Sequence, residues 1–198
     1  APANVAVIAM GRQGGCEAGY GSDVDVMFVH QPAPGVAPAE ATRFSVEVAK
    51  ALISFMKMPT RPPIVLEPIL EIDADLRPEG RRGPLVRSLD SYKAYFEQWA
   101  DTWEVQALLK ARPLAGAQYL LDEFMEWADS VRYTHGLNSV QEQAIQRMKA
   151  RVEAERLPRG AEPTRHIKLG RGGLTDVEWL AQTLQLKYTP DYPALRTT

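Results

Sequence analysis

Cysteine is almost absent from this 198-residue chain, since Cys16 is the only one. A single cysteine excludes an internal disulfide and a cysteine-rich zinc site. The sequence also lacks an apolar run approaching the roughly 20 residues that cross a bilayer, and it has no signal-peptide pattern. We therefore expect a reducing, cytoplasmic setting and no membrane partner.

The chain also has no large excess of positive or negative charge. The chain holds 23 Lys and Arg against 25 Asp and Glu, for a formal net charge of −2. A basic coat for nucleic acid is therefore not expected, and we predict no nucleic-acid partner. One local exception runs from residue 147 to 171, with eight basic and three acidic residues. The 45% of hydrophobic residues suffices for the core of one or two domains.

The apolar patterning changes character along the chain. Strands are expected first, at 4–10, 24–30, 64–72 and 85–89, with one helix at 39–58 between them. Helices alone follow, at 91–111, 120–132, 139–156 and 175–188, the last with Thr175 and Glu178 spaced as a capping box.

This order predicts an α+β fold, a sheet with flanking helices followed by a helical unit. We place the domain boundary at residue 116, which gives a sheet domain over 1–116 and a helical domain, incomplete here, over 117–198. Because the chain opens directly on a core strand, we expect it to be a piece of a longer protein. The aromatic residues of 91–111, Trp99 among them, are expected in the core at helical spacing.

The stretch Gly21-Ser22-Asp23-Val24-Asp25 carries the most chemical information. Two carboxylates separated by one strand residue project to the same face. Such a pair can hold hard divalent ions together with phosphate oxygens, and Gly21 and Ser22 can approach the phosphate. The alternative is a solvated strand edge, but the apolar neighbours of the pair argue that charge here has a purpose.

A third carboxylate is offered by Asp73, at the end of the third expected strand, or by Asp75 two residues later. Three carboxylates around two ions are typical of nucleotidyl transfer. Asp75 can equally well cap a turn. Arg77 and Arg81 follow closely and can meet phosphate or a protein substrate.

These motifs resemble those of the glutamine synthetase adenylyltransferase family. The resemblance rests on blocks in the family order that span almost the whole chain, at 11–15, 19–28, 72–78, 83–86, 103–104, 110–113 and 168–179. The Gly-Tyr-Gly-Ser-Asp wording of 19–23 is similar to that of the adenylylating half of the family. Asp75 departs from the family pattern, where a basic residue often stands.

The resemblance implies a DNA polymerase β-like nucleotidyltransferase domain that moves AMP from ATP to a tyrosine hydroxyl of glutamine synthetase. It implies two Mg²⁺ ions on Asp23, Asp25 and Asp73, which would be the catalytic residues. A PII-type signal protein is the implied regulator of the longer enzyme. The expected nucleotide-binding residues are Gly11, Gly14, Gly21, Ser22, Lys168 and Arg171. For Lys168 and Arg171 a plain structural role in the Gly-rich turn is the alternative.

Two other interpretations stay open. The same carboxylates serve the deadenylylating reaction, in which phosphate is the attacking group. A truncated regulatory module without turnover is the third possibility, although three retained acidic residues argue against it.

Overall fold

The computed structural model describes residues 1–59, 62, 70–158, 160–162 and 164–197. Within these ranges the chain forms two compact units, residues 1–100 with 110–128, and residues 101–109 with 129–197. This division differs from the expected boundary at residue 116 in two places: residues 101–109 group with the second unit, and most of α5 (Gln118–Arg132) groups with the first. No helix in the described part of the chain has the length and apolarity that crossing a bilayer requires.

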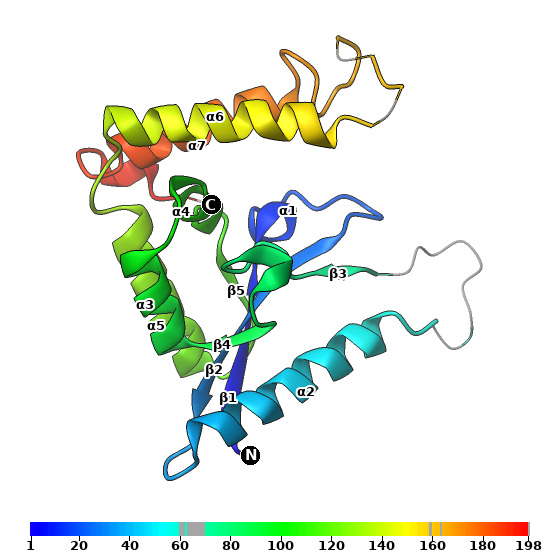
Figure 1. The fold of residues 1–198 in the computed structure, drawn as a ribbon, viewed down its shortest axis with the longest axis vertical. Helices are drawn as coiled ribbons and strands as arrows, with labels where there is room; N and C mark the ends of the chain where they lie inside the picture. Colours follow the sequence, from blue (N-terminus) through cyan, green and yellow to red (C-terminus); the bar gives the residue numbers. More distant parts are fainter. Residues whose placement is uncertain (60–61, 63–69, 159, 163, 198) are drawn as a thin grey trace. The chain divides into compact units, whose positions relative to one another are not determined.

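In the described part of the chain, the first unit is centred on a mixed sheet of five strands: β1 (Ala3–Ala9), β2 (Val24–Pro32), β3 (Ile72–Asp73), β4 (Val86–Ser88) and β5 (Arg112–Gly116). Their order is β3-β2-β1-β5, and β4 also pairs with β2. The two long strands β1 and β2 form where their β-prone sequences predict strands, and they pair antiparallel. One edge of β2 pairs in turn with β3 (Ile72–Asp73) and β4 (Val86–Ser88), both parallel to it. The expected α+β class is confirmed (Figure 1). Of the expected strand 64–72, residues 64–69 lie outside the described residues.

Helices cover the sheet on both sides (Figure 1). The long helix α2 (Pro38–Met56) packs on β1, β2 and β4 through a core that includes Val7, Phe28 and Ala49. On the side away from α2, α3 (Leu89–Gln98) and α5 run together. Their rings form one cluster, with centroids 5.1 to 6.2 Å apart among Tyr92, Phe96, Phe124 and Trp127.

The single helix expected at 91–111 is wrong, because the chain breaks it into two. Ser88 caps α3, and a capping box of Asp101 and Glu104 starts a new helix, α4 (Thr102–Leu108). Trp99 lies in the break and is 71% exposed, so its expected core position is also wrong. The chain then enters a strand that the sequence did not predict, β5 (Arg112–Gly116), which pairs antiparallel with β1.

The described part of the second unit is built mainly from α4, α6 (Ser139–Arg156) and α7 (Leu174–Tyr188). Their shared core contains Leu109, Tyr133, Ile145 and Leu186. The helices α6 and α7 are confirmed at their expected positions. The capping box expected at Thr175 is wrong, because the helix begins one residue earlier and the Thr175 hydroxyl donates to the carbonyl of Lys168 at 2.5 Å.

Candidate active site

Two acidic residues meet where β2 and β3 lie side by side. Asp25 and Asp73 are direct partners in this parallel pairing, which places their Cα atoms about 5 Å apart. Asp23 precedes the strand, two residues before Asp25, and is exposed. The backbone therefore places Asp25 beside Asp73. Asp23 lies just outside β2, so its place on the same face stays a prediction.

The side chains themselves are not gathered into a cluster. Among the described residues, no three His, Cys, Asp or Glu side chains form a group that could hold a metal ion. Oδ1 of Asp73 accepts the backbone N–H of Asp75 at 2.7 Å, and Oδ2 is the carboxylate oxygen that this bond does not use. The donor set is made of carboxylate oxygens alone, which is the chemistry that Mg²⁺ prefers. The residues therefore fit Mg²⁺ by donor type and by backbone placement.

Asp25 is held closely by the turn that follows β1. The N–H of Met10 donates to the backbone carbonyl of Asp25 at 2.8 Å. Gly11 has a φ of +50°, and a Cβ built on it would lie 2.2 Å from Asp25 Oδ2. A side chain here would strain the backbone at this φ and would force the Asp25 carboxylate or the turn to shift, because ordinary contact begins at 3.4 Å. Gly11 thus leaves the space that the Asp25 carboxylate occupies.

The segment from Gly11 to Gly21, here called the glycine segment, begins with the one-turn helix α1 (Gly11–Gly14). Gly14 is buried, and a Cβ on it would lie 1.8 Å from the backbone oxygen of Lys110. The Arg112 side chain donates to the carbonyls of Gln13 and Gly14, at 3.0 and 3.1 Å. Gly11 and Gly14 therefore have packing reasons for being glycine, and nucleotide contact stays a prediction for both.

Lys110 and Arg112 are residues whose support of the glycine segment the sequence did not reveal. They stand within a block that carried the family resemblance, but nothing in the local pattern ties them to residues almost 100 positions earlier. The available signal was a basic residue on each side of Ala111, directly before Pro113.

The Gly-Ser pair before Asp23 forms a turn closed by its own hydrogen bonds. The Ser22 hydroxyl oxygen accepts the N–H of Gly19 at 3.0 Å, and the N–H of Ser22 donates to the Gly19 carbonyl at 3.0 Å. Gly21 is exposed with a φ of +78°. To bind a phosphate, this turn would have to rearrange its hydrogen bonds or use its outer face. Phosphate binding by Gly21 and Ser22 stays a prediction.

Asp75 makes ion pairs with two arginines. Its Oδ2 lies 2.5 Å from Arg81 Nε, and its Oδ1 lies 3.5 Å from Arg77 Nη1. The Asp75 partner raises the pKa of the exposed Arg81 guanidinium. Arg77 is itself buried and donates to the carbonyls of Ala74 and Gly83 at 2.7 and 3.2 Å, so it fixes the turn after β3. These contacts favour the structural interpretation of Asp75 and of Arg77.

Lys168 and Arg171 belong to the second unit, in the turn before α7, and both are exposed. The turn is held by backbone bonds, with the N–H of Thr175 donating to Lys168 and that of Gly173 to Gly170. Asp176 accepts the N–H of Gly172 at 2.7 Å and pairs with Lys149. The nucleotide-binding role of Lys168 and Arg171 stays a prediction.

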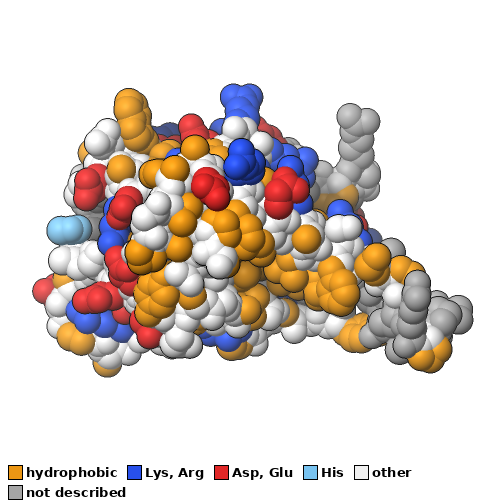
Figure 2. All heavy atoms as spheres, turned by 90° about the horizontal axis from the view of Figure 1, so that it is seen from below, with side chains coloured by type: hydrophobic (Ala, Val, Ile, Leu, Met, Phe, Trp, Pro, Cys, Tyr) orange, Lys and Arg blue, Asp and Glu red, His pale blue; other side chains and the backbone are white. Residues whose placement is uncertain are grey.

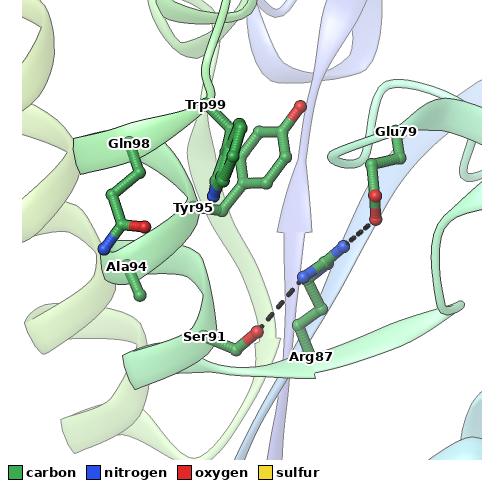
Figure 3. Close-up of a pocket in the computed structure, with 7 residues that line it drawn as sticks. All are labelled: Glu79, Arg87, Ser91, Ala94, Tyr95, Gln98 and Trp99. Carbon is green, nitrogen blue, oxygen red and sulfur yellow. Dashed lines mark hydrogen bonds and ion pairs between the residues drawn. The ribbon is translucent and has the colours of Figure 1, made fainter.

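A cavity of about 580 Å³ lies elsewhere in the first unit, lined by α3 and by residues before and within β4 (Figure 3). Arg87 stands in it between Glu79 and Ser91 and is linked to both. The rings of Tyr95 and Trp99 line the same cavity. None of the three predicted metal-binding carboxylates lines it, so it is separate from the candidate active site.

The surface carries charges of both signs. Figure 2 shows one face on which Lys and Arg side chains stand among Asp and Glu side chains. Along α6, i,i+4 ion pairs form between Lys149 and Glu153 and between Arg151 and Glu155. Two of the basic residues of the stretch 147–171 are thus partnered on their own helix.

Two protein-family models match parts of this chain. The family model for glutamate-ammonia ligase adenylyltransferase matches residues 1–127, and the model for PII-uridylyltransferase matches residues 140–197. A protein of Mycobacterium avium is 53% identical over the whole chain, one of Mycolicibacterium smegmatis 54%, and one of Mycobacterium tuberculosis 52%. All three are named bifunctional glutamine synthetase adenylyltransferase/adenylyl-removing enzyme.

The chain spans only about a fifth of these relatives, 19 to 20% of their length. The first family model nevertheless covers the entire sheet, the glycine segment and all three acidic residues. On this match, the chain belongs to the glutamate-ammonia ligase adenylyltransferase family.

Proposed function

We propose that this chain is the nucleotidyltransferase part of an enzyme that transfers AMP from ATP to a tyrosine hydroxyl of glutamine synthetase. The observation that carries the proposal is the parallel pairing of Asp25 with Asp73, with Asp23 two residues before Asp25 in the sequence. Family membership and the printed names of the relatives support the same reaction.

Asp23, Asp25 and Asp73 would hold two Mg²⁺ ions. When bound, Mg²⁺ supplies charge that activates the attacking oxygen and stabilises the leaving pyrophosphate. Gly21 and Ser22 would lie along the phosphates of ATP, and Lys168 and Arg171 would add positive charge to them.

The reaction forms a bond from the tyrosine oxygen to the α-phosphorus and breaks the bond from that phosphorus to the β-phosphate oxygen. Asp73 Oδ2 is suited to take the phenol proton, because Oδ1 already accepts the N–H of Asp75. The chain otherwise contributes position: Gly11 keeps the Asp25 carboxylate in one place, so the acidic groups are set before the reactants arrive.

A second candidate is the reverse modification, which the double name of the relatives favours. Phosphate would attack the α-phosphorus of the AMP-tyrosine, ADP would leave the site, and the tyrosine oxygen would regain its proton. The same three carboxylates would serve it.

We propose two further features of the longer enzyme. A PII-type signal protein is its regulator, which the match of residues 140–197 to the PII-uridylyltransferase model supports. Its setting is the cytoplasm.

The test incubates the chain with glutamine synthetase, Mg²⁺ and ATP labelled at the α-phosphate, and in parallel with AMP-modified glutamine synthetase and phosphate. Label on glutamine synthetase supports adenylylation, and label in ADP supports removal. The variant Asp23→Asn with Asp25→Asn should lose the activity. The matched control Asp122→Asn, which alters an exposed carboxylate on α5, should keep it. No turnover in either direction would favour a regulatory module without catalysis.

A further inference from the structure

The first turn of the glycine segment is supported by the start of β5. Helix α1 is a single turn, so its last carbonyls have no partner within the helix. The Arg112 guanidinium donates to two of these carbonyls: Nη2 donates to that of Gln13 at 3.0 Å and Nε to that of Gly14 at 3.1 Å.

Lys110 holds the next part of the segment. Its side chain is 11% exposed, and Nζ lies 2.6 Å from Glu17 Oε2. Glu17 is fixed on its backbone as well, because its N–H donates to the Arg12 carbonyl at 2.8 Å and its carbonyl accepts from Arg12 Nη2 at 3.1 Å. The Lys110 carbonyl oxygen fills the space beside Gly14. Side chain and backbone of Lys110 thus contact the segment at two points.

The opposite end of α1 meets the acidic site. Gly11 opens the helix and lies against Asp25 Oδ2, as described above. The strand that carries the supports is itself fixed, since Arg112 pairs with Ala9 at the end of β1. One helical turn therefore links Lys110 and Arg112 to the Asp25 carboxylate.

We propose that Lys110 and Arg112 are positioning residues, which hold α1 so that Gly11 confines the carboxylate of Asp25. The proposal deepens the proposed function and rests on it in one respect, namely that Asp25 binds a divalent ion. Outer residues that orient metal ligands typically change metal affinity by about 10- to 100-fold when they are replaced. Loosening the segment should therefore weaken metal binding without removing a ligand.

The experiment compares the variants Lys110→Met and Glu17→Gln with the control Lys93→Met, which breaks the Lys93–Glu123 pair in the same unit. Glu17→Gln changes a side chain that is 56% exposed, so this variant should fold even if Lys110→Met does not. The variant Lys110→Arg keeps a cation for Glu17 and should restore the wild-type result. Because carboxylate sites that suit Mg²⁺ also suit Mn²⁺, free Mn²⁺ is followed by electron paramagnetic resonance during a titration.

A second readout needs no metal. Hydrogen exchange is measured at three amides whose hydrogen bonds hold the first part of the segment, those of Gly14, Gly15 and Glu17. We expect faster exchange at these amides in Lys110→Met and Glu17→Gln, and none of this acceleration in Lys93→Met. The same two variants should raise the Mn²⁺ dissociation constant about tenfold, against less than about twofold for the control, in which no metal ligand is disturbed.

The exchange rates and the Mn²⁺ dissociation constants test different parts of the proposal. Unchanged exchange in Glu17→Gln and Lys110→Met would overturn the positioning role. Faster exchange with an unchanged Mn²⁺ constant would overturn the link to Asp25. If the wild type binds Mn²⁺ no better than Asp25→Asn, the proposed function fails at this site, and the exchange data still judge the hold of Lys110 on the segment.

Discussion

Replacing Gly11 by alanine tests the packing of the site most sharply. Gly11 has a φ of +50°, and its new Cβ would lie 2.2 Å from Asp25 Oδ2, where contact normally starts at 3.4 Å. The carboxylate or the turn must therefore move by about 1 Å, which corresponds to an overpacking cost of about 1–3 kcal/mol. The left-handed backbone adds about 1–2 kcal/mol for any residue with a Cβ.

Gly35→Ala is the matched control. Gly35 has a φ of +78° and nothing within 4 Å of a built Cβ, so it pays the backbone cost alone. Urea unfolding should then show a loss of about 1–2 kcal/mol for Gly35→Ala and about 2–5 kcal/mol for Gly11→Ala.

The functional consequence should separate the two variants more clearly than stability does. A displacement of about 1 Å in a reacting group can lower a rate by about 100-fold. We expect that loss of adenylyl transfer in Gly11→Ala, together with weaker Mn²⁺ binding, and near wild-type values in Gly35→Ala. Equal activity and equal Mn²⁺ affinity of the two folded variants would refute the idea that Gly11 confines Asp25.

Three further predictions concern stability in the first unit. His30 is 1% exposed, and burial lowers the pKa of its imidazole. The unfolded chain therefore binds a proton at this residue more readily than the folded chain. The unfolding free energy should fall as pH drops from about 6.5 towards the folded pKa, by at most about 1.4 kcal/mol per pH unit. His30→Gln should flatten this slope in urea titrations at several pH values, whereas exposed His135→Gln should keep it. Gly14→Ala should cost at least about 1–3 kcal/mol, because its Cβ would meet the Lys110 carbonyl at 1.8 Å; a wild-type melting temperature would contradict this packing. Tyr92→Phe should cost about 0.5–1.5 kcal/mol, because the buried hydroxyl donates to a backbone carbonyl at 3.3 Å; an unchanged urea midpoint would show that the bond adds nothing.

Much of the fold follows from local pattern. The apolar runs of β1 and β2 and the helical spacing of α2, α5, α6 and α7 are properties of adjacent residues, and the structure confirms them. The expected helix at 91–111 fails because apolar spacing continues across the break, while the capping box of Asp101 and Glu104 restarts the helix. Strand β5 escaped prediction because it is short and contains Pro113, which pairs at an irregularity in the β1–β5 register.

Part of the candidate site could likewise be predicted from local sequence, and part depends on contacts between distant residues. Strand alternation predicts that Asp23 and Asp25 share a face, but β2 begins at Val24, so for Asp23 this stays a prediction. That Asp73 lies beside Asp25 depends on the register of β3 on β2, which no local pattern contains. The support of Glu17 by Lys110 joins residues 93 positions apart and depends on β5, so it became visible only in three dimensions.

The most direct measurement of the central claim is a crystal structure of the chain with Mg²⁺ and a non-hydrolysable ATP analogue. We expect ions ligated by Asp23, Asp25 and Asp73, with the α-phosphate beside them and the triphosphate along Gly21 and Ser22. A nucleotide bound elsewhere, or ions that do not touch Asp25, would contradict this claim.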